Sequence, residues 1–225
     1  MNHIPDDPFA DETSSPTETL PDYVSHVSSV PVSLSRAPTY TLPRPKQPII
    51  YSFLHFNEDT VFLMPPRMPQ VPSPTPLYHI QTRIKVDPFL PFMYHTVVRR
   101  GGDEDGELVG EFEVSPTHRR AIVTFGEYAT RLSSIMTTFD KAKPTYRWKH
   151  RSVDIRWDCS TKLQDGSRMC ICTSSSQLQI ANFVPPPIDG SPPLPDATLT
   201  VFPDGHDIMD EIILSSLIIA RMIAL

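Results

Sequence analysis

The sequence contains few glycines and few cysteines, and its net charge is negative. Each of these features makes some classes of protein less probable than others. Only 8 of 225 residues are glycine, against 26 prolines, which favours strand ends and extended loops over a helical bundle. The three cysteines are an odd number, which fits free thiols in a reducing compartment. The formal net charge is −6, whereas a protein that binds nucleic acid in bulk is usually basic, so we expect no nucleic-acid partner.

Recognised catalytic and metal-binding motifs are missing as well. The sequence contains no GxSxG, GxGxxG or P-loop pattern, and its histidines do not form HExxH. Cys159, Cys170 and Cys172 lack the CxxC spacing of a zinc site. If Asp165-Gly166 forms a two-residue hairpin turn, Cys159 faces Cys172 across two strands, although free thiols are the favoured interpretation. We expect no enzyme activity, no cofactor and no metal.

Residues 1–47 are rich in Pro, Ser, Thr and Asp and have few large apolar side chains. Such a segment cannot bury enough surface to offset the entropy lost on ordering, so we predict a disordered tail. Leu20–Tyr23 (LPDY) faintly resembles a WW-domain ligand, and Pro43–Pro48 (PRPKQP) fits a PxxP ligand of SH3 domains, with a plain linker as the alternative. Because the N-terminus is acidic and lacks the apolar stretch of a secretory signal, we expect a cytoplasmic protein, with the nucleus or the membrane periphery as alternatives.

Short apolar or alternating runs begin near Pro48 and predict a domain over residues 48–225. They are rich in Val, Ile, Thr, Phe and Tyr and are bounded by turn residues, which is the pattern of β-strands. Eleven runs stand out: IIYSFLHF, TVFLM, LYHIQTRI, FMYHTVVRR, ELVGEFEV, RRAIVTF, TYRWKH, VDIRWDC, RMCICT, LQIANFV and ATLTVF. We therefore predict a mainly β fold of about 11–12 strands, closed or nearly closed.

The last segment, 207–225, has the pattern of a helix. Asp207 fits the N-cap position, and Asp210 and Glu211 place negative charge at the positive end of the helix dipole. The apolar run that follows spans about 14 residues and contains Arg221, whereas a membrane span needs about 20 apolar residues. Because the helix is apolar on every face, we predict that it is buried in protein. A barrel of about 11–12 strands has room for a helix, so the predicted fold is a β-barrel that encloses its C-terminal helix.

That architecture resembles the tubby-like barrel, which tubby, LURP-one-related and phospholipid-scramblase proteins share. The segments PLYHI, VVRRGG…GELVGEFE, YRWKH…IRWDC and LTVFPDGHDIMDEIILSSLIIAR resemble, more specifically, a basidiomycete fungal family with a domain of unknown function. The resemblance covers about residues 48–225. It implies a fold rather than an activity.

The segment KAKPTYRWKHRSVDIRWDC, residues 141–159, is the most informative for binding. If Arg151-Ser152 is a two-residue turn, alternation places the aromatic residues on one face and the charged residues on the other. Trp148 and Trp157 then join Leu217 and Ile218 of the helix in the core. On the outer face Lys149 opposes Asp154 and Arg147 opposes Arg156, and like charges in direct opposition are unfavourable unless an anion or an acid bridges them. The predicted anion-binding residues are Lys141, Lys143, Arg147, Lys149 and Arg156, and the alternative is an ordinary solvated hairpin.

The sequence therefore favours a non-enzymatic binding module, with anionic phospholipid headgroups as its ligands. One alternative is a protein-interaction module that uses SH3 or WW ligand motifs in the tail. Another is a membrane-associated, scramblase-like protein.

Overall fold

The computed structural model describes residues 44–67, 74–87, 90–115, 121–140 and 144–224, and they belong to one compact unit. The elements in these residues are β1 (Ile49–His55), β2 (Thr60–Met64), β3 (Tyr78–Asp87), β4 (Leu90–Arg100), β5 (Leu108–Val114), β6 (Ile122–Phe125), β7 (Tyr128–Arg131), α1 (Leu132–Ile135), β8 (Met136–Asp140), β9 (Thr145–His150), β10 (Val153–Lys162), β11 (Arg168–Ser174), β12 (Gln179–Val184), β13 (Thr198–Val201), the 3₁₀ helix η1 (Pro203–Ile208) and α2 (Met209–Ala224). The predicted disordered tail lies almost entirely outside the described residues.

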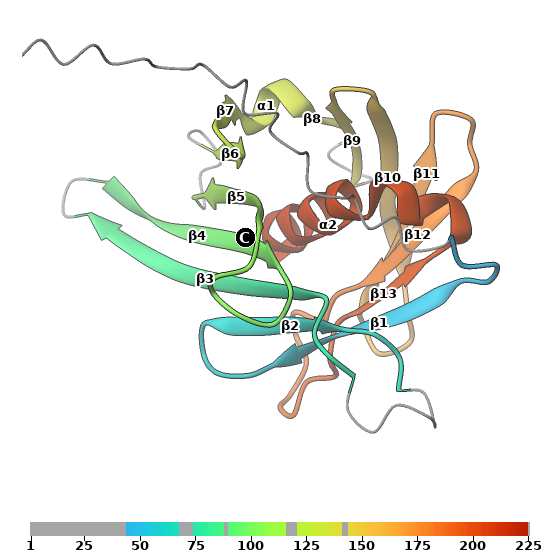
Figure 1. The fold of residues 1–225 in the computed structure, drawn as a ribbon, viewed down its shortest axis with the longest axis horizontal. Helices are drawn as coiled ribbons and strands as arrows, with labels where there is room; N and C mark the ends of the chain where they lie inside the picture. The colour runs from blue at the N-terminus through green and yellow to red at the C-terminus, as the bar shows by residue number, and fades with distance from the viewer. Residues whose placement is uncertain (1–43, 68–73, 88–89, 116–120, 141–143, 225) are drawn as a thin grey trace, which may run out of the picture. The chain divides into compact units, whose positions relative to one another are not determined.

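The strands form a single antiparallel sheet, in the order β7-β6-β5-β4-β3-β2-β1-β13-β12-β11-β10-β9-β8. Figure 1 shows them arranged around α2. The mainly β fold with a C-terminal helix is therefore confirmed. The ladder nevertheless has two ends, β7 and β8, which α1 connects along the chain but which are not paired with each other. In the described residues the predicted barrel is thus an open sheet rather than one closed by backbone hydrogen bonds.

The eleven apolar runs correspond to β1–β6 and β9–β13, whereas β7 and β8 were not predicted. β7 has no buried residue, and Met136 is the one buried residue among the described side chains of β8. Both strands lie at the ends of the sheet, where the inner face needs few apolar side chains. Without an alternating pattern the sequence contains no strand signal there.

α2 supplies the centre of the core. Its fully buried apolar residues are Ile212, Ile213, Leu214, Ile218 and Ile219. Trp148 and Trp157 are also fully buried, as predicted, and the Trp157 Nε1–H donates to Ser215 Oγ at 3.0 Å. Leu217 was predicted to be core as well, but it is only half-buried. No helix in the described part of the chain is long and apolar enough to cross a membrane.

The C-terminal helix begins later than predicted, and Asp207 is not the N-cap of α2. Pro203 starts η1, for which its fixed φ is suited, and α2 begins only at Met209. Asp207 lies instead 3.6 Å from the Arg44 guanidinium, which also forms an ion pair with Asp204. The chain just before β1 is thereby bound to η1.

Two glycines allow the backbone and the helix to approach closely. A Cβ atom on Gly110 of β5 would lie 3.0 Å from Leu214 Cδ1 and 2.9 Å from the Thr124 carbonyl oxygen. A Cβ atom on Gly205 of η1 would lie 2.3 Å from the Ile180 carbonyl oxygen. Any larger residue at these positions would push the helical segment away from the sheet.

The β10–β11 hairpin corrects the expected cysteine pairing. Its turn is longer than two residues, because Leu163 N–H donates to the Ser167 carbonyl at 2.8 Å, and a β-bulge follows between Asp158 and Thr161. The longer turn and the bulge each shift the strand pairing by one residue, and together they place Trp157, not Cys159, opposite Cys172. All three cysteines are free and buried. Hydrogen bonding with Cys170, and burial, raise the pKa of the Cys159 thiol, so the thiolate is strongly disfavoured.

We expect Ile218→Asp to unfold the domain. An unpaired buried carboxylate costs several kcal/mol, a large share of a typical domain stability of about 5–15 kcal/mol. Leu217→Asp, at a half-buried position, should give a folded domain of lower stability. Circular dichroism with urea titration distinguishes the two variants, and a stable Ile218→Asp domain would contradict a central role for α2.

Candidate functional site

A cavity of about 190 Å³ opens on the outer face of the sheet where β9, β10 and β11 run side by side. Its lining residues are Arg147, Asp154, Ile155, Arg156, Thr173, Ser174, Ser175 and Gln177. The charged lining residues of β9 and β10 alternate with buried Tyr146, Trp148, Ile155 and Trp157. The same alternation that builds the core therefore places the charges outside.

The strand register pairs two of the predicted cationic residues, Arg147 and Arg156, as the sequence predicted. Arg147 is paired with Arg156, and Lys149 with Asp154. The predicted turn is also present, with Arg151 in the left-handed region at φ +52°. On its other side Arg156 is paired with Thr173 of β11. Two guanidinium groups and a hydroxyl thus occupy neighbouring strands in one row.

The Asp154 carboxylate offsets part of the repulsion between Arg147 and Arg156. Asp154 accepts a hydrogen bond from Arg147 Nε at 2.8 Å and a second from Arg147 Nη2. These bonds from Arg147 hold the pKa of the Asp154 carboxyl below its usual range, so Asp154 stays ionised. The ion pair of Asp154 is therefore with Arg147 rather than with the directly opposed Lys149. This two-point geometry is the strong form of an arginine–carboxylate contact.

Arg156 has no such partner among the described residues. Its guanidinium lies over the Phe139 ring, 5.4 Å from the centroid, in a cation–π contact. With two guanidinium groups and one carboxylate, the cavity wall carries one excess positive charge. An oxyanion that enters the cavity would find Arg156 as a free charged donor, with neutral hydroxyl and amide groups around it.

The opposite wall comes from the loop between β11 and β12, which the sequence did not identify. Ser174, Ser175 and Gln177 line the cavity, and Gln177 adopts a left-handed conformation with φ +63°. The Gln177 N–H donates to the Ser174 carbonyl at 2.9 Å, which closes the turn. The run TSSSQ at 173–177 shows only an ordinary turn composition, so its sequence contains no signal of a binding wall.

The predicted basic residues divide into three groups. Arg147 and Arg156 line the cavity, whereas Lys149 is exposed beside it and does not contribute to the lining. Lys141 and Lys143 lie outside the described residues. Within the residues that the structure describes, no group of three His, Cys, Asp or Glu side chains is arranged to hold a metal ion.

A second polar cluster surrounds the first turn of α2, on the inner side of the sheet. Asp210 accepts a hydrogen bond from the Tyr78 hydroxyl at 2.7 Å and forms an ion pair with Arg100. Arg100 also lies 3.3 Å from Glu107. Burial, and then the nearby Asp210 charge, raise the pKa of Tyr78, so its hydroxyl remains a donor.

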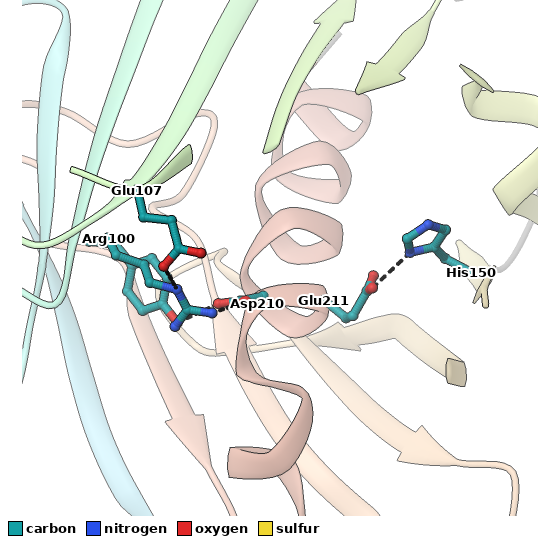
Figure 2. A network of polar contacts seen from close by, with 6 residues as sticks. Arg100, Glu107, His150, Asp210 and Glu211 are labelled. Carbon is teal, nitrogen blue, oxygen red and sulfur yellow. Dashed lines mark hydrogen bonds and ion pairs between the residues drawn. The ribbon is translucent and has the colours of Figure 1, made fainter. Parts of the chain in front are cut away.

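Glu211 forms the other half of this cluster. It accepts a hydrogen bond from Trp148 Nε1 at 2.7 Å and lies 2.8 Å from His150 Nδ1. Figure 2 shows Asp210 and Glu211 directed to opposite sides of the helix. Phe125 of β6 stacks on His150 with ring centroids 3.9 Å apart. Because these groups are already bonded to one another, the cluster is a structural link rather than a binding site.

Comparison with known proteins gives a family match. The family of unknown function DUF6593 matches residues 66–223 of the chain. No curated protein and no solved structure matches the chain. The expected resemblance to a domain-of-unknown-function family is therefore confirmed at that level.

We expect Glu211→Leu to lower the free energy of unfolding by about 3 kcal/mol, because it leaves the buried Trp148 N–H and His150 without their charged acceptor. Glu107→Leu is the matched control, since the Glu107 side chain is 77% exposed and an exposed ion pair contributes about 1 kcal/mol or less. Urea unfolding measures both. Equal losses for the two variants would show that Glu211 has no special role.

Proposed function

The chain belongs to the family of unknown function DUF6593, and from the geometry of its outer face we propose that it is a non-enzymatic module that binds anionic phospholipid headgroups. The observation that carries the proposal is the cavity between Arg147, Arg156 and the β11–β12 loop. It supplies the Arg156 guanidinium, which has no carboxylate partner among the described residues, together with the Ser175 hydroxyl and the Gln177 amide. These groups match the needs of a phosphate group.

The cavity has a size suited to part of a headgroup. A protein cavity of about 150 Å³ can hold a benzene molecule, so a cavity of about 190 Å³ has room for a phosphate and the polar atoms next to it. The excess charge of the wall is a single positive charge. Recognition therefore rests on one charge-assisted contact with Arg156, supported by neutral hydrogen-bond donors from the loop.

Exposed apolar side chains on both sides of the cavity favour a lipid surface over a free phosphate. Phe139 is 56% exposed and lies under the Arg156 guanidinium. Leu178 is 55% exposed and directly follows Gln177 of the cavity wall. Aromatic and aliphatic side chains beside a basic site can enter the interfacial layer while the guanidinium contacts phosphate.

The architecture is consistent with the tubby-like barrel that the sequence resembles. Antiparallel strands arranged around a C-terminal apolar helix support that relationship. The open seam between β7 and β8 would then be a departure from a fully closed barrel. We propose the relationship for the fold alone, since a shared fold does not transfer a ligand.

Vesicle flotation tests the site. We expect the full chain to float with phosphatidylcholine vesicles that contain a phosphatidylinositol phosphate, and to lose binding in high salt because the contact is electrostatic. Arg156→Gln should weaken binding by about 10–100-fold, the range for one charge-assisted hydrogen bond. Lys149→Gln removes an equal charge from the same hairpin outside the cavity and should have little effect.

Two further arms define the outcome of this experiment. Inorganic phosphate that displaces the protein from vesicles at low concentration would show a free-phosphate site instead of a lipid site. Equal losses for Arg156→Gln and Lys149→Gln would show general surface attraction, and binding that both variants retain would refute the site.

A second prediction concerns Asp154, which occupies the donors of Arg147. Asp154→Asn removes the negative charge and frees the Arg147 guanidinium for a ligand. We expect this variant to bind the same vesicles about tenfold more tightly, through one additional charge-assisted contact. The free energy of unfolding should fall by only about 1 kcal/mol or less, because the pair is partly exposed to solvent. Weaker vesicle binding by Asp154→Asn would mean that the carboxylate itself contacts the ligand.

A further inference from the structure

The hairpin of β3 and β4 continues past the C-terminal end of α2, as Figure 1 shows. The helix reaches the hairpin at Tyr94, whose ring lies 4.8 Å from the Arg221 guanidinium. Tyr94 is paired with Ile84. Residues of both strands between this pair and the hairpin tip therefore extend beyond the segment of sheet that α2 covers.

The inner face of this extension is apolar, and the part of the chain that the structure describes leaves it exposed. Residues 80, 82, 84 and 86 of β3 point to one side, and Ile80 at the start of this series is buried in the core. Further along, Ile84 is 60% exposed and Val86 is 80% exposed, and Phe92 on the neighbouring strand is 44% exposed. Phe92 packs edge-on against Tyr94 with ring centroids 5.7 Å apart. We call this surface, formed by Ile84, Val86, Phe92 and Tyr94, the hairpin inner face.

The outer face of the same hairpin is different in character. Lys85 forms an ion pair with Glu113, and His95 Nε2 lies 3.1 Å from Glu111. Lys85 and His95 have partners on β5, and Arg83 on the same face is exposed to solvent, so that face is charged rather than apolar. The contrast limits the unpartnered apolar surface to the inner face.

Arg221 provides a second, independent feature at the same place. It is half-buried against Tyr94, and burial lowers the pKa of its guanidinium. No carboxylate of the described residues forms an ion pair with it. A guanidinium that is partly removed from water and lacks an acid partner is a position where an incoming carboxylate gains a charge-assisted hydrogen bond.

We propose that the hairpin inner face docks an amphipathic helix of a partner protein, with acidic residues of its first turn placed against Arg221. The rest of this inner face is covered by a helix, α2, so a second helix would continue the same packing along the hairpin. Its apolar stripe would cover Ile84, Val86 and Phe92.

The electrostatics favour one orientation of the docked helix. Its N-terminus, the positive end of its dipole, would meet the C-terminal end of α2, which carries unpaired carbonyl groups and the negative end of a dipole. Acidic residues stabilise the first turn of a helix, and in this orientation they face Arg221. The reverse orientation would bring two negative dipole ends together.

A synthetic probe tests the proposal with the full chain. The probe is a labelled amphipathic helical peptide of leucine, alanine and lysine with two glutamates in its first turn. A matched peptide carries glutamines at those two positions. We expect saturable binding in fluorescence anisotropy, with the glutamate peptide bound about tenfold more tightly than the glutamine peptide, as one charge-assisted hydrogen bond provides.

Three variants assign the site. Arg221→Gln should abolish the preference for glutamate, and Ile84→Ser with Val86→Ser should weaken both peptides. Ile50→Ser is the matched control, since Ile50 is an apolar residue of β1 that is 57% exposed and away from the hairpin. The Ile50→Ser variant should bind both peptides as tightly as the unchanged chain does.

Four results would overturn the proposal. The first is no saturable binding of either peptide, and the second is equal binding of both by the unchanged chain. The third is binding to phosphatidylcholine vesicles that Ile84→Ser with Val86→Ser removes, which would assign the face to lipid. The fourth is a dimer in analytical ultracentrifugation that the same double variant converts to monomer, which would assign the face to a second copy of the chain.

Discussion

Two adjacent carboxylates, Asp210 and Glu211, hold the two halves of an open sheet against one helix. Consecutive residues of a helix project about 100° apart, so neighbouring side chains can reach different walls. Asp210 bonds Tyr78 and Arg100 of β3 and β4, while Glu211 bonds Trp148 and contacts His150 of β9. These walls lie on either side of the seam where β7 and β8 end the ladder. The first turn of α2 therefore does by side-chain contacts what a closed ladder would do by backbone hydrogen bonds.

The core and the outer cavity depend on each other through the strand period of two. Trp148 and Trp157 are fixed in the core by Glu211 and Ser215, and this fixes the register of β9 against β10. Their neighbours Arg147 and Arg156 then have to face outward in direct opposition. A slip of β9 by one residue against β10 would bury the Arg147 guanidinium and expose the Trp148 indole, which makes the alternative register very costly. Core packing determines the register even though it brings the two arginines into direct opposition. The ion pair of Arg147 with Asp154 offsets part of their repulsion.

Prediction from the sequence succeeded where a local pattern determines the structure. Alternation located eleven strands, and the short turn at Arg151 gave the correct register of the β9–β10 hairpin. It failed where the pattern is absent or where a longer turn intervenes. β7 and β8 lack an apolar alternation, and the bulge near Asp158 shifted the partner of Cys172. Asp207 resembled an N-cap, but Pro203 had already started a helical turn before it.

One wall of the candidate site could be predicted from a local pattern, and the other could not. Its arginines follow from the hairpin register, whereas Ser174, Ser175 and Gln177 reach the cavity only because β11 packs beside β10. The most direct test of an anion site is nuclear magnetic resonance of the arginine side chains during titration with glycerol 3-phosphate. The Nε–H signal of Arg156 should shift saturably, while that of exposed Arg83 should not move. Uniform small shifts of all arginine signals, or none at all, would contradict a built anion site on this face.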